Sequence, residues 1–365
     1  MKRNSKIFRS ISAIMAIIIC ACSLSVLGGC SDTESINVRI YGQYLDLDAV
    51  DMFEDETGIR VNMDECDTPE ELYNKAVNGD SSYDLICTSD YIVERFIKED
   101  MLLELNFDNI PNKSKIGNTY WEHSKTFDPE LKYSVPHFWG TVGVIYNTKI
   151  VAEEDTKSWD MFFNEKYSGQ IIMANSIRDS FLVALKSLGY SLNTTDKTQI
   201  DEAKKLLIEQ KPLVKAYQVE TEARDSMISG DAAMALVYNG EAYLAIEGDE
   251  ELGIQGNPDL AFTIPEEGTN LWIDSWVVPK YCANQANAEK FINFLCREDI
   301  AEKNFDYIYY STPNQALYES LDEDIKNDDD IFPPQNIVDK SEVMKSLGAD
   351  LDAYYSAAWK EIKAE

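Results

Sequence analysis

Short apolar segments alternate with amphipathic ones along the chain. Residues 36–41 alternate apolar and polar side chains, which is typical of a half-buried strand. Residues 48–56 place apolar side chains at helical spacing and run into Gly58, a residue type that often ends a helix. Residues 59–63 again have the composition of a strand. The chain therefore begins with a predicted strand, helix and strand.

The next predicted helix has a clear start signal. Thr68 is a good N-cap, Pro69 suits the first helical position, and Glu71 stands where a capping-box acid is expected. Residues 83–87 then form an apolar run typical of a buried strand, and residues 91–98 follow as a helix. Strands that alternate with helices predict an α/β fold with a parallel sheet.

The same pattern continues to the end of the chain. It predicts strands at 170–173, 232–237 and 271–278, and helices at 179–188, 198–209, 286–296, 301–307 and 350–362, with another helix directly after the strand at 232–237. The chain has 365 residues, which is more than one hydrophobic core usually serves. Two α/β lobes are therefore expected, and no flexible linker separates them.

The first residues read as an export signal. Four basic residues lie within 1–9, a short apolar run covers 11–26, and small residues follow. This order predicts a secretory signal peptide over 1–29. The ending Leu27-Gly28-Gly29-Cys30 resembles the lipobox of bacterial lipoproteins, which implies that Cys30 carries lipid and that 30–36 tether the protein to the outer face of the membrane. An ordinary signal peptide with a chance Cys is the alternative.

The charge of the chain narrows the class of partner. There are 33 basic and 65 acidic residues, for a net charge of −32. Such a chain is not expected to bind nucleic acid, which requires basic surface. It would attract cations instead, although solubility alone could also explain the charge.

Motifs for catalysis, metals and cofactors are missing from the sequence. Only His123 and His137 are present, and there is no GxSxG, P-loop, GxGxxG or HExxH motif. The cysteines after Cys30 have no zinc-site spacing, and whether they form disulfides is left open by the spacing: Cys66, Cys87, Cys282 and Cys296. Neither an enzyme nor a metal or cofactor protein is expected.

Aromatic and acidic residues gather where the predicted strands end. They are Tyr41, Gln43, Tyr44, Ser89, Tyr91 and Tyr238, with Trp272 and Asp274 inside the last strand. Ligands of open α/β sheets bind beyond the carboxyl ends of the strands. Carboxylates bind an ammonium group by charge-assisted hydrogen bonds, and aromatic faces attract the cation and cover its methylenes. An organic amine is favoured, although aromatic residues also stack on sugars and also pack lobe against lobe.

A series of segments is spread in order along nearly the whole mature chain. The segments include Tyr41-Gly42-Gln43-Tyr44, Tyr83-Asp84-Leu85, Trp139-Gly140, Trp272-Ile273-Asp274-Ser275 and Ser311-Thr312-Pro313-Asn314. This series resembles the spermidine/putrescine-binding proteins of ABC transporters, within the bacterial extracellular solute-binding proteins of family 1. The resemblance implies a type II periplasmic-binding-protein fold, with a ligand cleft between two lobes joined by hinge crossings. Lobe 1 would comprise 37–145 and 275–320, and lobe 2 would comprise 146–274 and 321–365.

The resemblance also assigns roles. It implies an aromatic box of Tyr41, Tyr44, Tyr91, Tyr238 and Trp272, polar contacts from Gln43, Ser89 and Tyr310, and ammonium contacts from Asp179 and Asp274. Three positions depart from the family pattern: Gln43 and Ser176 stand where acids are usual, and Met344 stands near an expected Gln. These departures leave the choice between putrescine, spermidine and another amine open.

The function implied is that of a monomeric, extracytoplasmic binding protein that delivers a polyamine to the permease subunits of an ABC importer. Three other functions stay open. The protein could bind another organic cation or a sugar, it could report ligand levels as a sensor, or, least in keeping with the motifs, it could be a secreted hydrolase.

Overall fold

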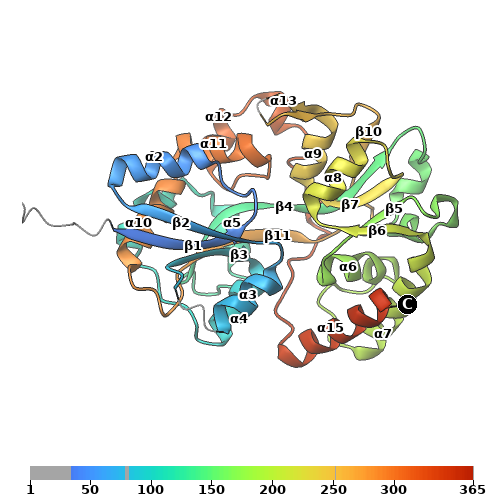
Figure 1. Ribbon diagram of the computed structural model, residues 1–365, viewed down its shortest axis with the longest axis horizontal. Coiled ribbons are helices and arrows are strands. Elements are labelled where there is room, and N and C mark those ends of the chain that lie inside the picture. Colours follow the sequence, from blue (N-terminus) through green and yellow to red (C-terminus); the bar gives the residue numbers. More distant parts are fainter. Residues whose placement is uncertain (1–33, 79–81, 251, 365) are drawn as a thin grey trace, which may run out of the picture.

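The computed structural model describes residues 34–78, 82–250 and 252–364. The predicted signal peptide, Cys30 and most of the predicted tether lie outside these residues. Two lobes lie side by side and share one sheet (Figure 1). Within the described part of the chain, no helix combines the length and the apolar character that crossing a bilayer requires.

The first half of the sheet forms the centre of lobe 1. The strands β1 (Ser35–Tyr41), β2 (Arg60–Cys66) and β3 (Leu85–Ser89) are parallel, with β1 in the middle. Next to β3 lies the antiparallel strand β11 (Leu271–Val277), which pairs in turn with the beginning of the long strand β4 (Ser134–Asn147).

The end of β4 opens the second half of the sheet, in lobe 2. Residues 142–146 pair with β7 (Met234–Tyr238), which is followed by β5 (Ile171–Ala174) and β6 (Val214–Gln218). The strand β10 (Leu260–Thr263) also pairs with β4. A separate ribbon joins β8 (Gly248–Asp249) and β9 (Ile254–Gln255). Because β4 belongs to both halves, it connects the two lobes directly.

Helices cover the sheet in both lobes (Figure 1). Lobe 1 carries α2 (Leu47–Thr57), α3 (Pro69–Val77), α4 (Asp90–Lys98), α5 (Asn118–Ser124), α10 (Gln285–Leu295), α11 (Glu298–Ile308) and α12 (Gln315–Ser320). Lobe 2 carries α6 (Ile177–Ser187), α7 (Lys197–Gln210), α8 (Glu220–Ile228), α9 (Asn239–Glu247) and the terminal α15 (Ala349–Ala364). The short helices α13 (Glu323–Lys326) and α14 (Gln335–Val338) lie between α12 and α15.

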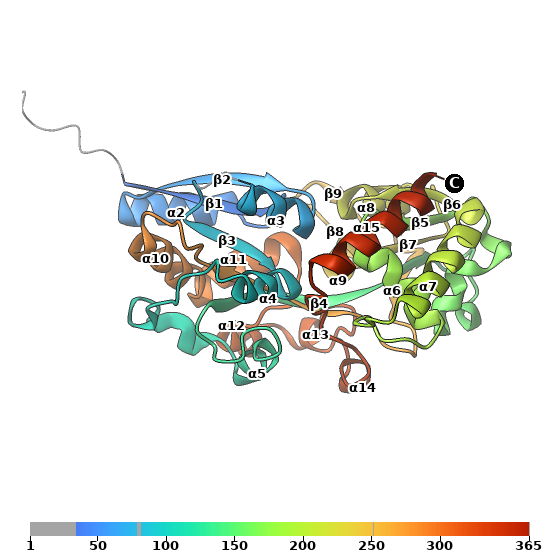
Figure 2. The same ribbon diagram turned by 90° about the horizontal axis from the view of Figure 1, so that it is seen from below.

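The chain crosses between the lobes along β4, between β10 and β11, and between α12 and α15. The segment that leads into α15 at the last crossing also contacts lobe 1. Figure 2 shows α15 lying across lobe 2 with its first turn directed toward α4 of lobe 1. There the Arg95 guanidinium lies 2.8 Å from the Asp352 carboxylate, and Glu94 accepts a hydrogen bond from the Ser346 backbone N–H at 2.6 Å. This architecture confirms the predicted two-lobed fold with hinge crossings.

Every predicted strand and helix in the described residues is present, with ends shifted by a few positions. The start of α3 forms as expected, because the Thr68 hydroxyl accepts a hydrogen bond from the Glu71 N–H at 3.2 Å. The end of α2 is also as expected, with Gly58 in the left-handed conformation. Two of the predicted lobe boundaries, at 145/146 and 274/275, fall inside β4, which both lobes share, and inside β11 of lobe 1, so the predicted division assigned Asp274 to lobe 2 although its strand pairs within lobe 1. The exact boundaries stay a prediction.

The four cysteines of the described residues are free thiols, and all but Cys282 are buried. Burial raises the pKa of Cys66, Cys282 and Cys296 to about 12, so these groups remain protonated at neutral pH.

Candidate ligand-binding site

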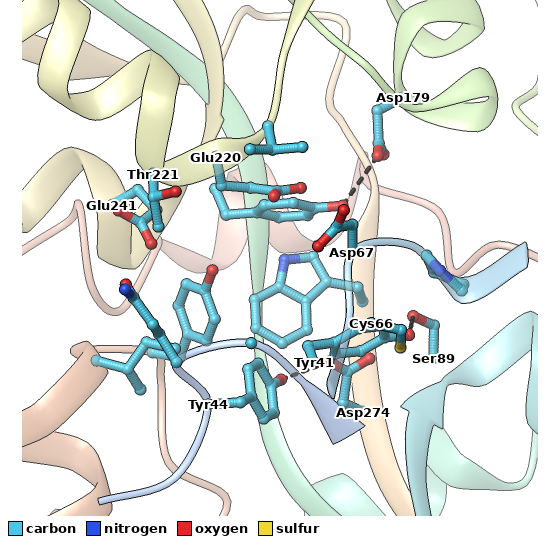
Figure 3. A pocket seen from close by; sticks show the side chains of 18 of the residues that line it. Tyr41, Tyr44, Cys66, Asp67, Ser89, Asp179, Glu220, Thr221, Glu241 and Asp274 are labelled. Atoms are coloured by element: carbon cyan, nitrogen blue, oxygen red, sulfur yellow. Dashed lines mark hydrogen bonds between the residues drawn. The ribbon is translucent and has the colours of Figure 1, made fainter. Parts of the chain in front are cut away.

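A cavity of about 300 Å³ lies between the lobes and is lined by residues from both. Figure 3 shows the acidic and aromatic side chains that surround it. All ten residues predicted to contact a ligand line this one cavity: Tyr41, Gln43, Tyr44, Ser89, Tyr91, Asp179, Tyr238, Trp272, Asp274 and Tyr310. Their contacts with a ligand stay a prediction.

The ends of neighbouring strands bring these residues together. Tyr41 ends β1, Ser89 ends β3 and Tyr238 ends β7. Asp274 of β11 stands opposite Ser89 in the strand register. The Tyr41 hydroxyl lies 3.0 Å from the Ser89 hydroxyl, which links the first two strand ends. The site therefore follows the rule that open α/β sheets bind ligands at the ends of their strands.

The aromatic rings of the cavity support one another at steep angles. The Trp272 ring centre lies 4.9 Å from that of Tyr310 and 5.7 Å from that of Tyr238, at 74° and 86°. Tyr44 contacts Tyr310 in turn, with ring centres 5.8 Å apart. The edge-to-face contacts of Trp272 and the tilted contact of Tyr44 hold these rings in place. The resulting aromatic wall crosses from lobe 1 to lobe 2.

Gly140 of β4 makes room for the central ring. A Cβ at this position would lie 2.6 Å from the Trp272 ring and would collide with the Asn239 side-chain oxygen. Only glycine lets the indole lie against this strand. The Trp139-Gly140 pair, seen in the sequence as a family feature, therefore has a packing role.

Each lobe contributes a buried aspartate that accepts a hydrogen bond from a tyrosine hydroxyl. In lobe 1, Tyr44 donates to Asp274, and in lobe 2, Tyr238 donates to Asp179 at 2.9 Å. Burial raises the pKa of both carboxyls, and that of Asp274 reaches about 6. The hydrogen bonds that each carboxyl accepts act in the opposite direction and lower its pKa. Both groups are 5% exposed or less, so a cation between them would be shielded from water.

The cavity holds further carboxyls that the sequence reasoning did not single out: Glu65, Asp67, Asp90, Glu220 and Glu241. With 65 acids in the chain, sequence gave no means of ranking them. Two of them stood near a signal, because Asp90 lies between Ser89 and Tyr91 at one strand end and Glu241 directly follows the Tyr238-Asn239-Gly240 segment at another.

These carboxyls differ in their partners. The buried Glu241 is paired at 2.9 Å with Arg224, whose side chain is 11% exposed. Asp90 accepts backbone N–H groups from Tyr91 and Ile273, at 2.7 and 3.3 Å. Neither group is left without a donor.

Two departures from the family pattern occupy different places. Ser176 does not line the cavity; it caps α6, and its hydroxyl accepts the Asp179 N–H at 3.4 Å. Met344 does line the cavity and is 2% exposed. Met344 thus adds apolar surface to the wall, and Ser176 orients the helix that carries Asp179.

Two buried polar atoms of the wall lack a hydrogen-bond partner within the described residues. They are the Asn270 Oδ1 and the Trp272 Nε1. Both residues line the cavity and are at most 5% exposed. Buried polar groups are nearly always paired, so these atoms indicate a place for a polar guest.

A family model described as bacterial extracellular solute-binding protein matches residues 48–333. The chain is a bacterial extracellular solute-binding protein. Family membership confirms that this solute-binding protein is not an enzyme. In the residues that the structure describes, no group of three or more His, Cys, Asp and Glu side chains is placed to hold a metal ion.

The relatives of this solute-binding protein cover almost its whole length. A spermidine/putrescine-binding periplasmic protein of Salmonella typhimurium is 30% identical and covers 92% of this chain and 93% of its own. A putrescine-binding periplasmic protein of Escherichia coli is 25% identical, over 97% of each chain. The solved spermidine/putrescine ABC transporter substrate-binding protein of Streptococcus pneumoniae is 31% identical, covers 91% of this chain and 99% of its own, and has a TM-score of 0.74. These relatives confirm the predicted family resemblance and the fold.

Proposed function

We propose that this solute-binding protein binds a polyamine outside the cytoplasm and delivers it to the permease of an ABC importer. The observation that carries the proposal is the pair of buried aspartates, Asp274 from lobe 1 and Asp179 from lobe 2, in one aromatic cavity. The names of the relatives from Salmonella typhimurium and Streptococcus pneumoniae support the same class of ligand.

The cavity suits the chemistry of a flexible amine. Asp274 and Asp179 would accept hydrogen bonds from the two terminal ammonium groups, and such charge-assisted bonds are the strong ones. Trp272 and the tyrosines would cover the methylenes, at roughly 0.8 kcal/mol for each buried CH₂. The same rings attract ammonium groups by about 0.5–2 kcal/mol each. A neutral sugar would leave both buried carboxylates without a counter-charge.

Closure of the two lobes gives a mechanism for delivery. Because each lobe holds one aspartate, a ligand that bridges them binds the closed arrangement better than an open one and shifts the population toward it. Hinge closure around a ligand is an established type of transition in two-lobed proteins. The permease would then recognise the closed form, and no bond is made or broken.

The test is thermal unfolding and calorimetric titration of the mature protein with putrescine, with spermidine and with a neutral disaccharide as control. A ligand at one hundred times its Kd stabilises the native state by about 2.7 kcal/mol, which is easily measured. We expect stabilisation by at least one polyamine and none by the disaccharide. If neither polyamine shifts the transition or produces heat, the polyamine function is wrong.

Anchoring by lipid on Cys30 is part of the proposal and has its own test. Replacing Cys30 with Ser should move the protein from the detergent phase to the aqueous phase in a partition experiment, because the acyl chains would be lost. If the variant still partitions with detergent, the protein is held by something other than lipid on Cys30.

A further inference from the structure

Glu220 lines the cavity from the first turn of α8, in lobe 2. In Figure 3 its carboxyl reaches toward the side of the cavity where Asp67 and Asp179 lie. Within the described chain the carboxyl makes no ion pair, and its one hydrogen-bond partner is its own backbone N–H. In contrast, Glu241 has Arg224 as a partner, and Asp179 has the Tyr238 hydroxyl.

The charged groups that face Glu220 are themselves carboxyls. They come from three separate elements: Asp179 on α6, Glu241 on α9 and Asp67 after β2. Burial, followed by these three charges, raises the pKa of Glu220 to about 8. The protein thus directs a carboxyl into its cavity where acids from three other elements face it.

The nearby cations are already engaged elsewhere. Arg224 pairs with Glu241, and the Arg178 guanidinium donates to the backbone carbonyls of Leu192 and Lys345, both at 3.1 Å. A cation that balanced Glu220 would therefore have to come from outside the protein.

A second observation indicates a guest that donates hydrogen bonds. The Asn270 Oδ1 lines the same cavity, is an acceptor and lacks a donor within the described residues, and Asn270 is 4% exposed. Ammonium N–H groups are donors of the kind that such an oxygen lacks. The amide oxygen therefore offers a place for an N–H group, and the Glu220 carboxyl favours a guest with one more positive charge than Asp274 and Asp179 alone would require.

Resting on the proposed polyamine function, we propose that Glu220 is a third ammonium-binding carboxylate, which makes the cavity select triamines over diamines. Asp274 and Asp179 suffice for the two charges of a diamine. A third ammonium in a cavity shielded from water needs a third acid, since an unpaired buried charge is costly. A diamine, in turn, leaves Glu220 protonated and without an ammonium partner.

Proton release distinguishes this role from a structural one. Without ligand, the Glu220 carboxyl is largely protonated at neutral pH, because its pKa is raised to about 8. An ammonium beside it favours the charged form and lowers that pKa. Binding a triamine near neutral pH should therefore release a proton from Glu220, whereas binding a diamine should release less.

The test is calorimetric titration of the mature protein with spermidine and putrescine, in buffers of different ionisation enthalpy. The variants are Glu220→Gln and, as matched control, Glu222→Gln, an exposed glutamate on the same helix. The wild type should bind spermidine about tenfold more tightly than putrescine. Glu220→Gln should lose this preference through weaker spermidine binding, with putrescine affinity within about threefold of wild type, and should release fewer protons. Glu222→Gln should behave as wild type.

The outcomes separate this inference from the proposed function. If the wild type binds neither amine, the polyamine function itself is wrong. If the wild type binds amines but prefers putrescine, or if Glu220→Gln changes neither preference nor proton release, only the role of Glu220 is overturned. If Glu220→Gln weakened the binding of spermidine and putrescine equally, the role of Glu220 would also be overturned, because this carboxyl would then not distinguish a triamine from a diamine.

Discussion

Replacement of Asp274 by Asn is the sharpest test of the site. Asp274 is 5% exposed and accepts a hydrogen bond from Tyr44, so an ammonium bound beside it would be shielded from water. Removing one partner of a buried, hydrogen-bonded charge pair costs about 2–5 kcal/mol. At about 1.4 kcal/mol for each factor of ten, the Kd for the polyamine should rise by about thirtyfold to three-thousandfold.

The same substitution should stabilise the protein without ligand. Burial raises the pKa of Asp274 from 3.8 to about 6, so the charged form is held in the folded state at a cost. One pKa unit corresponds to about 1.36 kcal/mol, which gives a gain of up to about 3 kcal/mol. The sign follows from the raised pKa: the cost of the charge is fully present above pH 6 and disappears as the pH falls toward 3.8.

The assay is calorimetric titration together with thermal unfolding, at a pH well above 6. Asp51→Asn is the control, because Asp51 is an exposed carboxylate on α2 of the same lobe and its replacement also removes one negative charge. The control should leave the Kd within about threefold of wild type. An equally small effect of both variants would refute the ammonium contact at Asp274. A loss of affinity accompanied by a lower unfolding temperature would refute the electrostatic reasoning, since it would indicate damage to the fold.

Three further predictions test other parts of the structure. Gly140→Ala should weaken polyamine binding without touching the ligand, because its Cβ would displace the Trp272 ring, and the loss of ring packing should be visible in near-UV circular dichroism; unchanged affinity would contradict the role of the indole. Thr68→Ala should destabilise the protein by about 1 kcal/mol in urea unfolding, because the N-cap hydrogen bond to the Glu71 N–H is lost. Polyamine affinity should fall as the pH is lowered through 6, because Asp274 has a pKa of about 6 and must be charged to hold an ammonium; an affinity independent of pH would contradict this.

Local signals in the sequence were enough to predict most of the elements and many of the residues in the site. Thr68 and Gly58 act through bonds and dihedral angles within one helical turn, so their effect can be read from neighbouring residues. The aromatic residues at strand ends could be found in the same way, because the pattern of apolar and polar residues shows where each strand ends. All ten predicted contact residues line the cavity. The strand pattern pointed to eight of them, whereas Asp179 and Tyr310 were predicted from the family resemblance alone.

The long strand β4 was not predicted. Its burial is almost continuous over 134–147, so the alternation that marks a strand is missing, and Pro136, Gly140 and Gly143 interrupt the apolar pattern. Only pairing with β11 on one side and β7 on the other makes this segment a strand. The connection between the lobes therefore depends on residues distant in the sequence.

Sequence patterns were sufficient to predict the family, most strands and helices in their order, and the aromatic and acidic character of the site. Which acids line the cavity, and which of them have a cationic partner, depends on how the chain packs. Glu220 and Glu241 are ordinary acids in a chain that has 65 of them, and only packing gives Glu241 an arginine and leaves Glu220 facing other carboxyls. The physical reason is that identity and local spacing are written along the chain, whereas burial and the charges that face a group arise only when distant segments meet.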